Sequence, residues 1–144
     1  MPNVRRFTFR KSERLSSKIQ VDRLFGGGSK SMVAFPLRIV YRLEDAERQN
    51  VSVLISVSKK HFHHAVDRNR VKRQIREAYR LNKQMLWDSF QGTPKALFLA
   101  LIWLDDKLYT SEEVDKRVIN LLKRVSEKLP LMIQEHLSED EKQI

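Results

Sequence analysis

The spacing of hydrophobic residues predicts three strands. Apolar and polar residues alternate over residues 32–43 and again over residues 51–58, which is the period of a half-buried strand. Pro36 interrupts the first of these segments and predicts a break or an edge position there. Residues 96–104 are continuously apolar. That pattern predicts a strand covered on both faces.

Helical spacing predicts the remaining elements. A short amphipathic helix is expected within residues 15–25, ended by Gly26-Gly27-Gly28. A second helix is expected from residue 68 to about residue 87, with Asp67 as its N-cap. Thr110-Ser111-Glu112-Glu113 is a capping box that predicts a third helix, interrupted by Pro130, with a further short helix over residues 131–137.

The order of these elements predicts the fold class. Helix, strands, helix, strand and helix indicate an α/β (α+β) two-layer sandwich with a single small mixed sheet and about three helices. The length of 144 residues is that of one domain, so we expect residues 1–144 to form one, with flexible ends at residues 1–10 and 138–144.

Composition excludes several classes of function. The chain has no cysteine, which excludes disulfides, zinc–thiolate sites and cysteine nucleophiles. Its longest apolar run is far shorter than the roughly 20 residues that a membrane helix needs. We therefore expect a soluble cytoplasmic protein that does not contact a membrane.

The charge indicates a polyanionic partner. The formal net charge is +10. Residues 1–80 hold 19 basic and 7 acidic side chains, a net charge of +12, whereas residues 81–144 hold 9 and 11, a net charge of −2. Because the excess is concentrated in one part of the chain, we expect one surface to face nucleic acid.

Residues 59–80 concentrate this charge on one side of a predicted helix. With Val71 taken as the centre of the buried stripe, Ile75, Ala78 and Tyr79 fall within about 80° of it. The polar stripe beside it lies at about 100–200° and contains Asn69, Lys72, Arg73, Arg76 and Arg80. A solvated helix face would mix the two signs of charge, so this stripe is better explained by phosphate binding. Asn69 is either a nucleotide contact or an ordinary first-turn residue.

The same segment resembles the protein component of bacterial ribonuclease P. The resemblance rests on Ser56-Val57-Ser58-Lys59-Lys60 followed by Arg68-Asn69-Arg70-Val71-Lys72-Arg73-Gln74-Ile75-Arg76, and covers roughly residues 5–130. It implies a left-handed βαβ crossover, although the general rule is right-handed. It also implies a protein subunit of an RNA-catalysed endoribonuclease, which assists removal of the 5′ leader of precursor tRNA without catalytic residues of its own.

The resemblance also implies partners and site residues. The partners would be the catalytic RNA and precursor tRNA, not DNA; the protein would bind no cofactor or metal, and the RNA-catalysed reaction would use magnesium. The residues expected at the catalytic RNA are Lys59, Lys60, Arg68, Asn69, Arg70, Lys72, Arg73, Arg76 and Arg80. The cleft for the leader would lie between the first helix and the sheet, with Val21, Phe25, Arg38 and Tyr41 as its candidate residues. Phe25 is alternatively a core residue.

Three of the four histidines lie within four residues of one another, just before the predicted second helix. His61, His63 and His64 suggest either a metal or acid–base site or, better, phosphate contacts, since Asp67 is the one nearby carboxylate and is expected to cap the helix. The alternative function is a ribosome-associated or chaperone-type RNA-binding protein without a role in tRNA cleavage. A protein nuclease that uses the histidines is a further rival.

Overall fold

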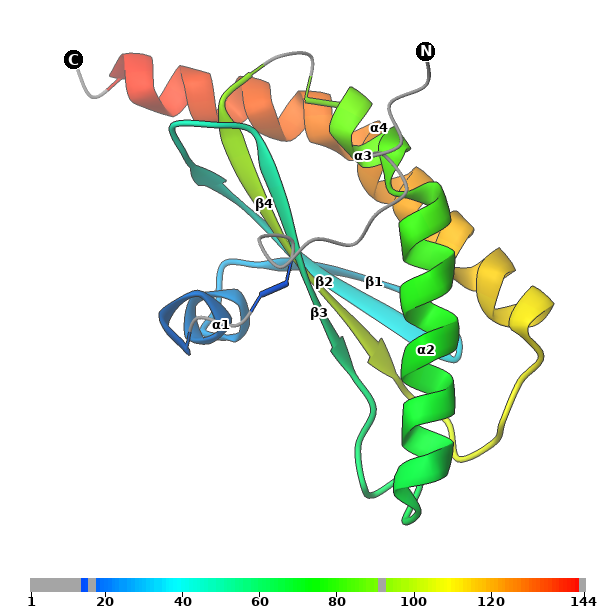
Figure 1. The fold of residues 1–144 in the computed structure, drawn as a ribbon. Coiled ribbons are helices and arrows are strands. Elements are labelled where there is room, and N and C mark those ends of the chain that lie inside the picture. Colours follow the sequence, from blue (N-terminus) through cyan, green and yellow to red (C-terminus); the bar gives the residue numbers. More distant parts are fainter. Residues whose placement is uncertain (1–13, 16–17, 91–92, 143–144) are drawn as a thin grey trace.

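The computed structural model describes residues 14–15, 18–90 and 93–142, with side chains described as far as residue 135. Its elements follow the predicted order (Figure 1). They are α1 (Lys18–Phe25), β1 (Lys30–Ala34), β2 (Leu37–Asp45), β3 (Asn50–Ser56), α2 (Ala65–Asn82), α3 (Gln84–Asp88), β4 (Lys95–Trp103) and α4 (Ser111–Lys142).

The four strands form one mixed sheet in the order β1-β2-β4-β3. β2 pairs antiparallel with β1 and with β4, whereas β3 pairs parallel with β4. The predicted strand over residues 32–43 is thus two strands, because a cis Phe35–Pro36 bond turns the chain between them. The apolar strand β4 occupies the interior of the sheet, which explains why nearly all its side chains are buried.

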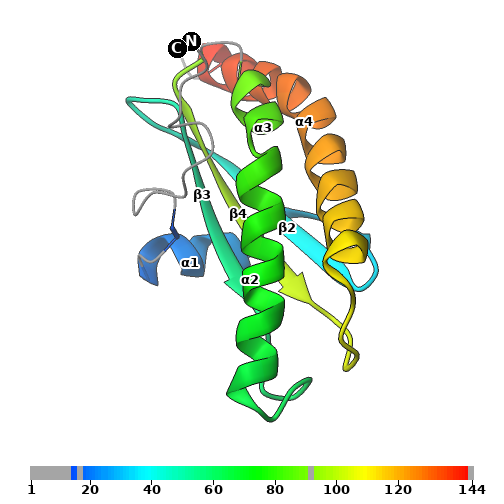
Figure 2. The ribbon, with the colours of Figure 1, turned by 45° about the vertical axis from the view of Figure 1, so that its right-hand side comes forward.

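The parallel pair is joined by a left-handed crossover. Figure 2 shows β3 and β4 running downward with β4 to the right of β3, while α2 returns in front of the sheet. This is the hand that the family resemblance implied and the opposite of the general rule. It brings α2 onto the same face of the sheet as α4.

The sheet has helices on both faces (Figures 1 and 2). The larger core lies between the sheet and α2, α3 and α4, and contains the alternate β2 residues Leu37, Ile39, Tyr41 and Leu43. The smaller core lies beneath α1. The α+β fold and the single mixed sheet are confirmed, and the short α3 adds a fourth helix within the described residues.

Three predicted helix boundaries are wrong. α2 begins at Ala65 with His64 as its N-cap, and Asp67 lies inside the first turn, where no side chain caps the helix. The helical segment predicted to reach residue 87 is split after Asn82 into α2 and α3. α4 continues through Pro130 without a second helix, because Leu129, Met132 and Ile133 on both sides of the proline are buried in the core.

Candidate nucleic-acid interface

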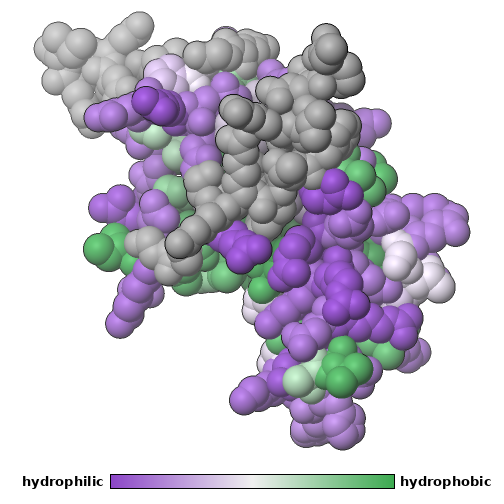
Figure 3. Space-filling view, in the orientation of Figure 1, coloured by the Kyte–Doolittle hydropathy of each residue, from purple (hydrophilic) through white to green (hydrophobic). Residues whose placement is uncertain are grey.

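The buried side of α2 fixes which way its basic residues point. Val71, Ile75, Ala78 and Tyr79 are buried against the sheet and α4. Asn69, Arg70, Arg73 and Arg76 are exposed on the other side of the helix, and Lys72 and Arg80 are half-buried beside them. We call these six residues the α2 stripe. Figure 3 shows that hydrophilic side chains gather over α2.

The charges in the middle of the α2 stripe are not neutralised by ion pairs within the described residues. Among the described residues, no ion pair joins Arg70, Arg73 or Arg76 to a carboxylate. Arg80 differs, because its guanidinium donates to Glu77 with N–O distances of 3.1 and 2.5 Å. That hydrogen bond, more than any other contact, lowers the pKa of Glu77. Three guanidiniums thus remain for an external anion.

Arg68 holds the start of α2 in place. Its guanidinium donates to the carbonyl oxygens of Phe62 and His63 at 2.8 and 2.9 Å. Arg68 therefore acts on the loop that precedes the helix, and it is half-buried there. This positioning contact was missed in the sequence, where Arg68 reads as one more cation of the basic run. Arg68 was predicted to contact RNA, and the contacts of its guanidinium in the structure are with backbone carbonyls of the loop before α2.

The loop before α2 carries the two lysines and three histidines. Lys59, Lys60, His63 and His64 are exposed there, next to the first turn of α2. His61 is half-buried, and its Nδ1 lies 2.7 Å from Oδ1 of Asp106, in the loop after β4. Asp67 is therefore not the one carboxylate near the histidines. Within the part of the chain that the structure describes, no cluster of three potential metal ligands is present.

Three of the four candidate cleft residues lie on the α1 side of the sheet, two of them on α1 itself. Phe25 is 49% exposed at the end of α1. Val21 is half-buried against the smaller core, and Arg38 is exposed on β2. Figure 3 shows a hydrophobic area over α1. The alternative assignment of Phe25 to the core is therefore wrong.

Tyr41 was placed on this face incorrectly. It is 1% exposed and belongs to the larger core on the opposite face of the sheet. Burial raises the pKa of its phenol, and the positive charge of Arg124 on α4 partly offsets this increase. Side chains alternate between the two faces of a strand, so Tyr41 and Arg38 cannot share one. The sequence also offers Phe7 and Phe9 as aromatic residues that could stack on the leader, and both lie outside the described residues.

Arg42, which the sequence did not single out, ties α1 to the sheet. Its guanidinium donates to the carbonyl oxygens of Gly27 at 2.8 Å and Arg23 at 3.4 Å, and its Nε donates to Glu44 at 2.7 Å. Gly27 and Gly28 have φ angles of 109° and 80°, which other residues rarely adopt. The triple glycine is thus a bend in which Arg42 holds the carbonyl of Gly27. Another arginine lies in the same strand, so the pattern of β2 does not single out Arg42.

No helix within the described residues has both the length and the apolar composition that would let it cross a membrane.

Comparisons with known proteins identify relatives of this chain. The family profile described as Ribonuclease P matches residues 9–126. The ribonuclease P protein component of Porphyromonas gingivalis is 42% identical over 125 residues, which cover 86% of this chain and 90% of that protein. That of Chlorobaculum tepidum is 47% identical over 73 residues, covering 48% and 47%.

Solved structures show the same fold. The ribonuclease P protein of Thermotoga maritima superposes with a TM-score of 0.61 at 25% identity, covering 78% of this chain and 96% of that one. That of Staphylococcus aureus has a TM-score of 0.56 at 18% identity, covering 80% and 96%, and supports the fold alone. The profile match spans most of the chain, and a relative more than 40% identical is aligned along nearly its whole length. The chain therefore belongs to the Ribonuclease P protein family.

Proposed function

We propose that this chain is the protein subunit of a cytoplasmic ribonuclease P and assists removal of the 5′ leader of precursor tRNA. In this proposal the α2 stripe binds the catalytic RNA, and the face beside α1 receives the leader. The RNA supplies the bond-breaking chemistry together with its magnesium ions. The observation that carries the proposal is the exposed group Arg70, Arg73 and Arg76, unpaired among the described residues and held by a rigid, buried helix face.

The electrostatics of the stripe favour a bound phosphate backbone. Arg73 and Arg76 are three residues apart on α2, and so are Arg70 and Arg73, which makes them neighbours on the helix surface. Like charges at this spacing destabilise a helix by a few tenths of a kcal/mol per pair, on the order of 0.2–0.5 kcal/mol. Phosphates placed between the guanidiniums replace this repulsion with attraction, and they release counterions from the RNA.

The α1 face offers a different kind of contact. The exposed ring of Phe25 can stack on an unpaired base, which is worth about 1–3 kcal/mol where it occurs. Arg38 provides a cation on the same side of the sheet. Lys59 and Lys60 extend the basic surface from α2 into the loop after β3. A single-stranded leader and a folded RNA can then be bound by two distinct surfaces.

Reconstitution with a bacterial ribonuclease P RNA at low magnesium tests the proposal. We expect the protein to increase cleavage of precursor tRNA, and Arg70→Ala, Arg73→Ala and Arg76→Ala each to weaken binding to the catalytic RNA by about 5- to 100-fold. Their melting temperatures should stay near that of the unmodified protein, because these side chains are exposed. Lys123→Ala, which removes an exposed charge from α4, is the matched control.

Salt dependence gives an independent measurement in the same experiment. Each lost phosphate contact should reduce the slope of log affinity against log salt by about 0.7–0.9. The proposal is wrong if the unmodified protein leaves cleavage unchanged, or if affinity for precursor tRNA is independent of the leader. Such leader-independent binding would instead favour a general RNA chaperone.

A further inference from the structure

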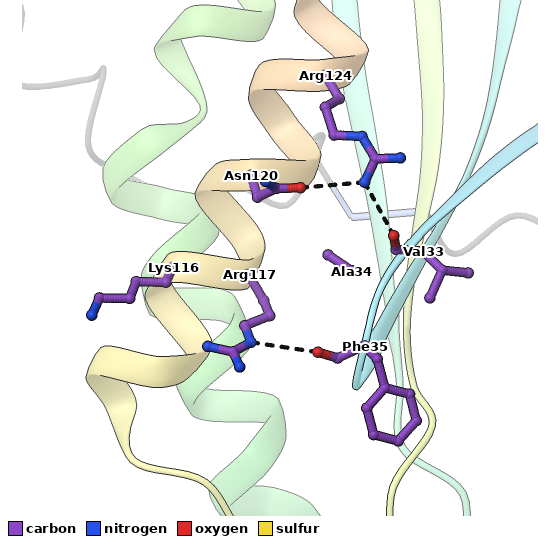
Figure 4. Close-up of a pocket in the computed structure, with 7 residues that line it drawn as sticks. All are labelled: Val33, Ala34, Phe35, Lys116, Arg117, Asn120 and Arg124. Atoms are coloured by element: carbon purple, nitrogen blue, oxygen red, sulfur yellow. Dashed lines mark hydrogen bonds between the residues drawn. The ribbon is translucent and has the colours of Figure 1, made fainter.

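A second basic site lies at the opposite edge of the sheet from β3. A pocket of about 430 Å³ separates the end of β1 and the turn after it from one side of α4. It is lined by Val33, Ala34, Phe35, Lys116, Arg117, Asn120 and Arg124. Figure 4 shows Arg117 and Arg124 reaching from α4 toward this strand. Its volume is in the range of ligand pockets, roughly 300–1,000 Å³.

The two arginines are held in position by neutral acceptors. Nε of Arg117 donates to the carbonyl of Phe35 at 3.4 Å, and Nη1 of Arg124 donates to that of Val33 at 3.1 Å. Arg117 also donates to the carbonyl of Glu113 at 3.4 Å, and Arg124 to Oδ1 of Asn120 at 3.3 Å. Each guanidinium has five N–H groups, so these bonds leave several donors available.

The charge of the pocket is not neutralised within the described part of the chain. No ion pair joins Arg117 or Arg124 to a carboxylate there. Lys116, at the outer rim, is 3.6 Å from Glu112, and both side chains are largely exposed. Two oriented guanidiniums without a counter-charge are suited to bidentate contact with phosphate.

An exposed aromatic ring adds a second kind of contact. Phe35 is 58% exposed at the turn between β1 and β2. Its carbonyl faces Arg117, and its ring points away from α4, on the outer side of the turn (Figure 4). A phosphate site on one side of this turn and an exposed aromatic ring on the other match the two parts of an unpaired nucleotide, since bases stack on aromatic side chains and the backbone binds cations.

We propose that this pocket binds an unpaired nucleotide of RNA, with Arg117 and Arg124 on its phosphate and Phe35 against its base. The α2 stripe is at a different place in the fold, because α2 packs against β3 and α4, whereas the pocket lies between α4 and β1 at the opposite edge of the sheet. The nucleotide comes from either the catalytic RNA or the precursor tRNA. The inference rests on the proposed function only in taking RNA as the partner.

The test compares two double variants of the full-length protein. Arg117→Gln/Arg124→Gln removes the two phosphate ligands. Lys123→Gln/Lys128→Gln removes the same charge from exposed positions of the same helix that do not line the pocket. Each protein is titrated with the catalytic RNA alone, and each reconstituted holoenzyme is titrated with precursor tRNA. Salt slopes are measured in both titrations, and circular dichroism checks folding.

We expect Arg117→Gln/Arg124→Gln to lose about 5- to 20-fold in affinity in one of the two titrations. The salt slope should fall by roughly 0.7–0.9, because both arginines bind the same phosphate. A loss with the catalytic RNA alone identifies that RNA as the source, and a loss with precursor tRNA only identifies the substrate. The control should lose less than about twofold. Equal losses in both double variants, or no loss in either titration, overturn the proposal.

Arg117 and Arg124 also contact the β1 strand, so a second variant covers a folding defect. Phe35→Ala leaves both arginines in place and removes an exposed ring. It should weaken the same titration by at least about threefold, and unchanged affinity contradicts the proposal. If the α2 variants lose RNA binding and the pocket variants do not, only this inference fails. If neither set loses binding, the proposed function fails as well.

Discussion

Phe25 and Leu24 are adjacent residues with opposite roles. Phe25 is 49% exposed and Leu24 is 1% exposed beneath the same helix. Apolar composition alone did not separate them, because both fit the apolar stripe of a short helix. The structure separates them, because the last turn of α1 directs Leu24 into the smaller core and leaves Phe25 at its edge.

Substitution of each residue by alanine should therefore have a different effect. We expect Leu24→Ala to lower the free energy of unfolding by about 2–5 kcal/mol through the cavity it leaves. Phe25→Ala should lower it by less than about 1 kcal/mol and instead reduce the holoenzyme's preference for substrates with a 5′ leader. Urea unfolding and cleavage of long-leader and leaderless substrates measure the two effects. An unchanged substrate ratio in a folded Phe25→Ala protein would place the leader elsewhere.

Tyr109 and Asp105 give a residue-scale pH dependence. The hydroxyl of Tyr109 donates to Asp105 at 2.7 Å. This hydrogen bond is the largest cause of the lowered pKa of Asp105 and of the raised pKa of Tyr109. A carboxyl group whose pKa is lower in the folded state stabilises the protein at pH values above its unfolded-state pKa. This stability is lost as the pH falls through the folded-state pKa. A phenol whose pKa is higher in the folded state stabilises the protein at pH values below its unfolded-state pKa, and this stability is lost as the pH rises through the folded-state pKa.

Tyr109→Phe should therefore reduce the melting temperature most between these limits, from about pH 5 to about pH 9. The difference from the unmodified protein should shrink in acid, where Asp105 is protonated, and in strong alkali, where Tyr109 ionises. Thermal unfolding of both proteins across this range is the measurement. A difference that persists undiminished at about pH 2 would show that the hydrogen bond is not its cause.

At the scale of elements, local signals predicted the start of α4 but not its end. Thr110 and Glu113 form the reciprocal bonds of a capping box, with N–O distances of 3.0 and 3.2 Å. These groups are three residues apart and need no tertiary contact to meet. Pro130 is an equally strong local signal, but burial of the residues around it keeps the helix continuous. The predicted start of α2 was wrong for a similar reason, because the contact of Arg68 with the preceding loop determines where the helix begins.

The cap of α4 can be tested by two substitutions at one position. We expect Thr110→Ala to lower the free energy of unfolding by about 1 kcal/mol, because the N–H of Glu113 loses its acceptor. Thr110→Ser keeps the hydroxyl and should cost only a few tenths of a kcal/mol, about 0.3 kcal/mol. Equilibrium unfolding in urea distinguishes the two. Equal losses in the two variants would mean that the methyl group, not the cap, is responsible.

At the scale of the whole molecule, the order of the elements predicted the fold class. Periodicity along a single helix predicted the exposed basic side of α2, apart from Arg70. It did not predict which residues meet across elements. Tyr41 was assigned to the wrong face, since alternation shows that two faces exist but not which helix covers each. The pairs His61–Asp106 and Arg124–Val33 are 45 and 91 residues apart, and no spacing rule connects them.

The strand order also has a consequence for synthesis of the protein. β4 is the last strand in the sequence, yet it lies between β2 and β3. During translation, β3 and α2 leave the ribosome before β4, the strand that pairs with β3. Within the described residues, the pairing available earlier is the β1–β2 hairpin and a single bridge between Arg14 and Val53. An isolated hairpin is marginally stable. The nascent chain thus exposes its most basic segment in an unfolded form until β4 has emerged, and the folded RNA-binding helix is a late product of translation.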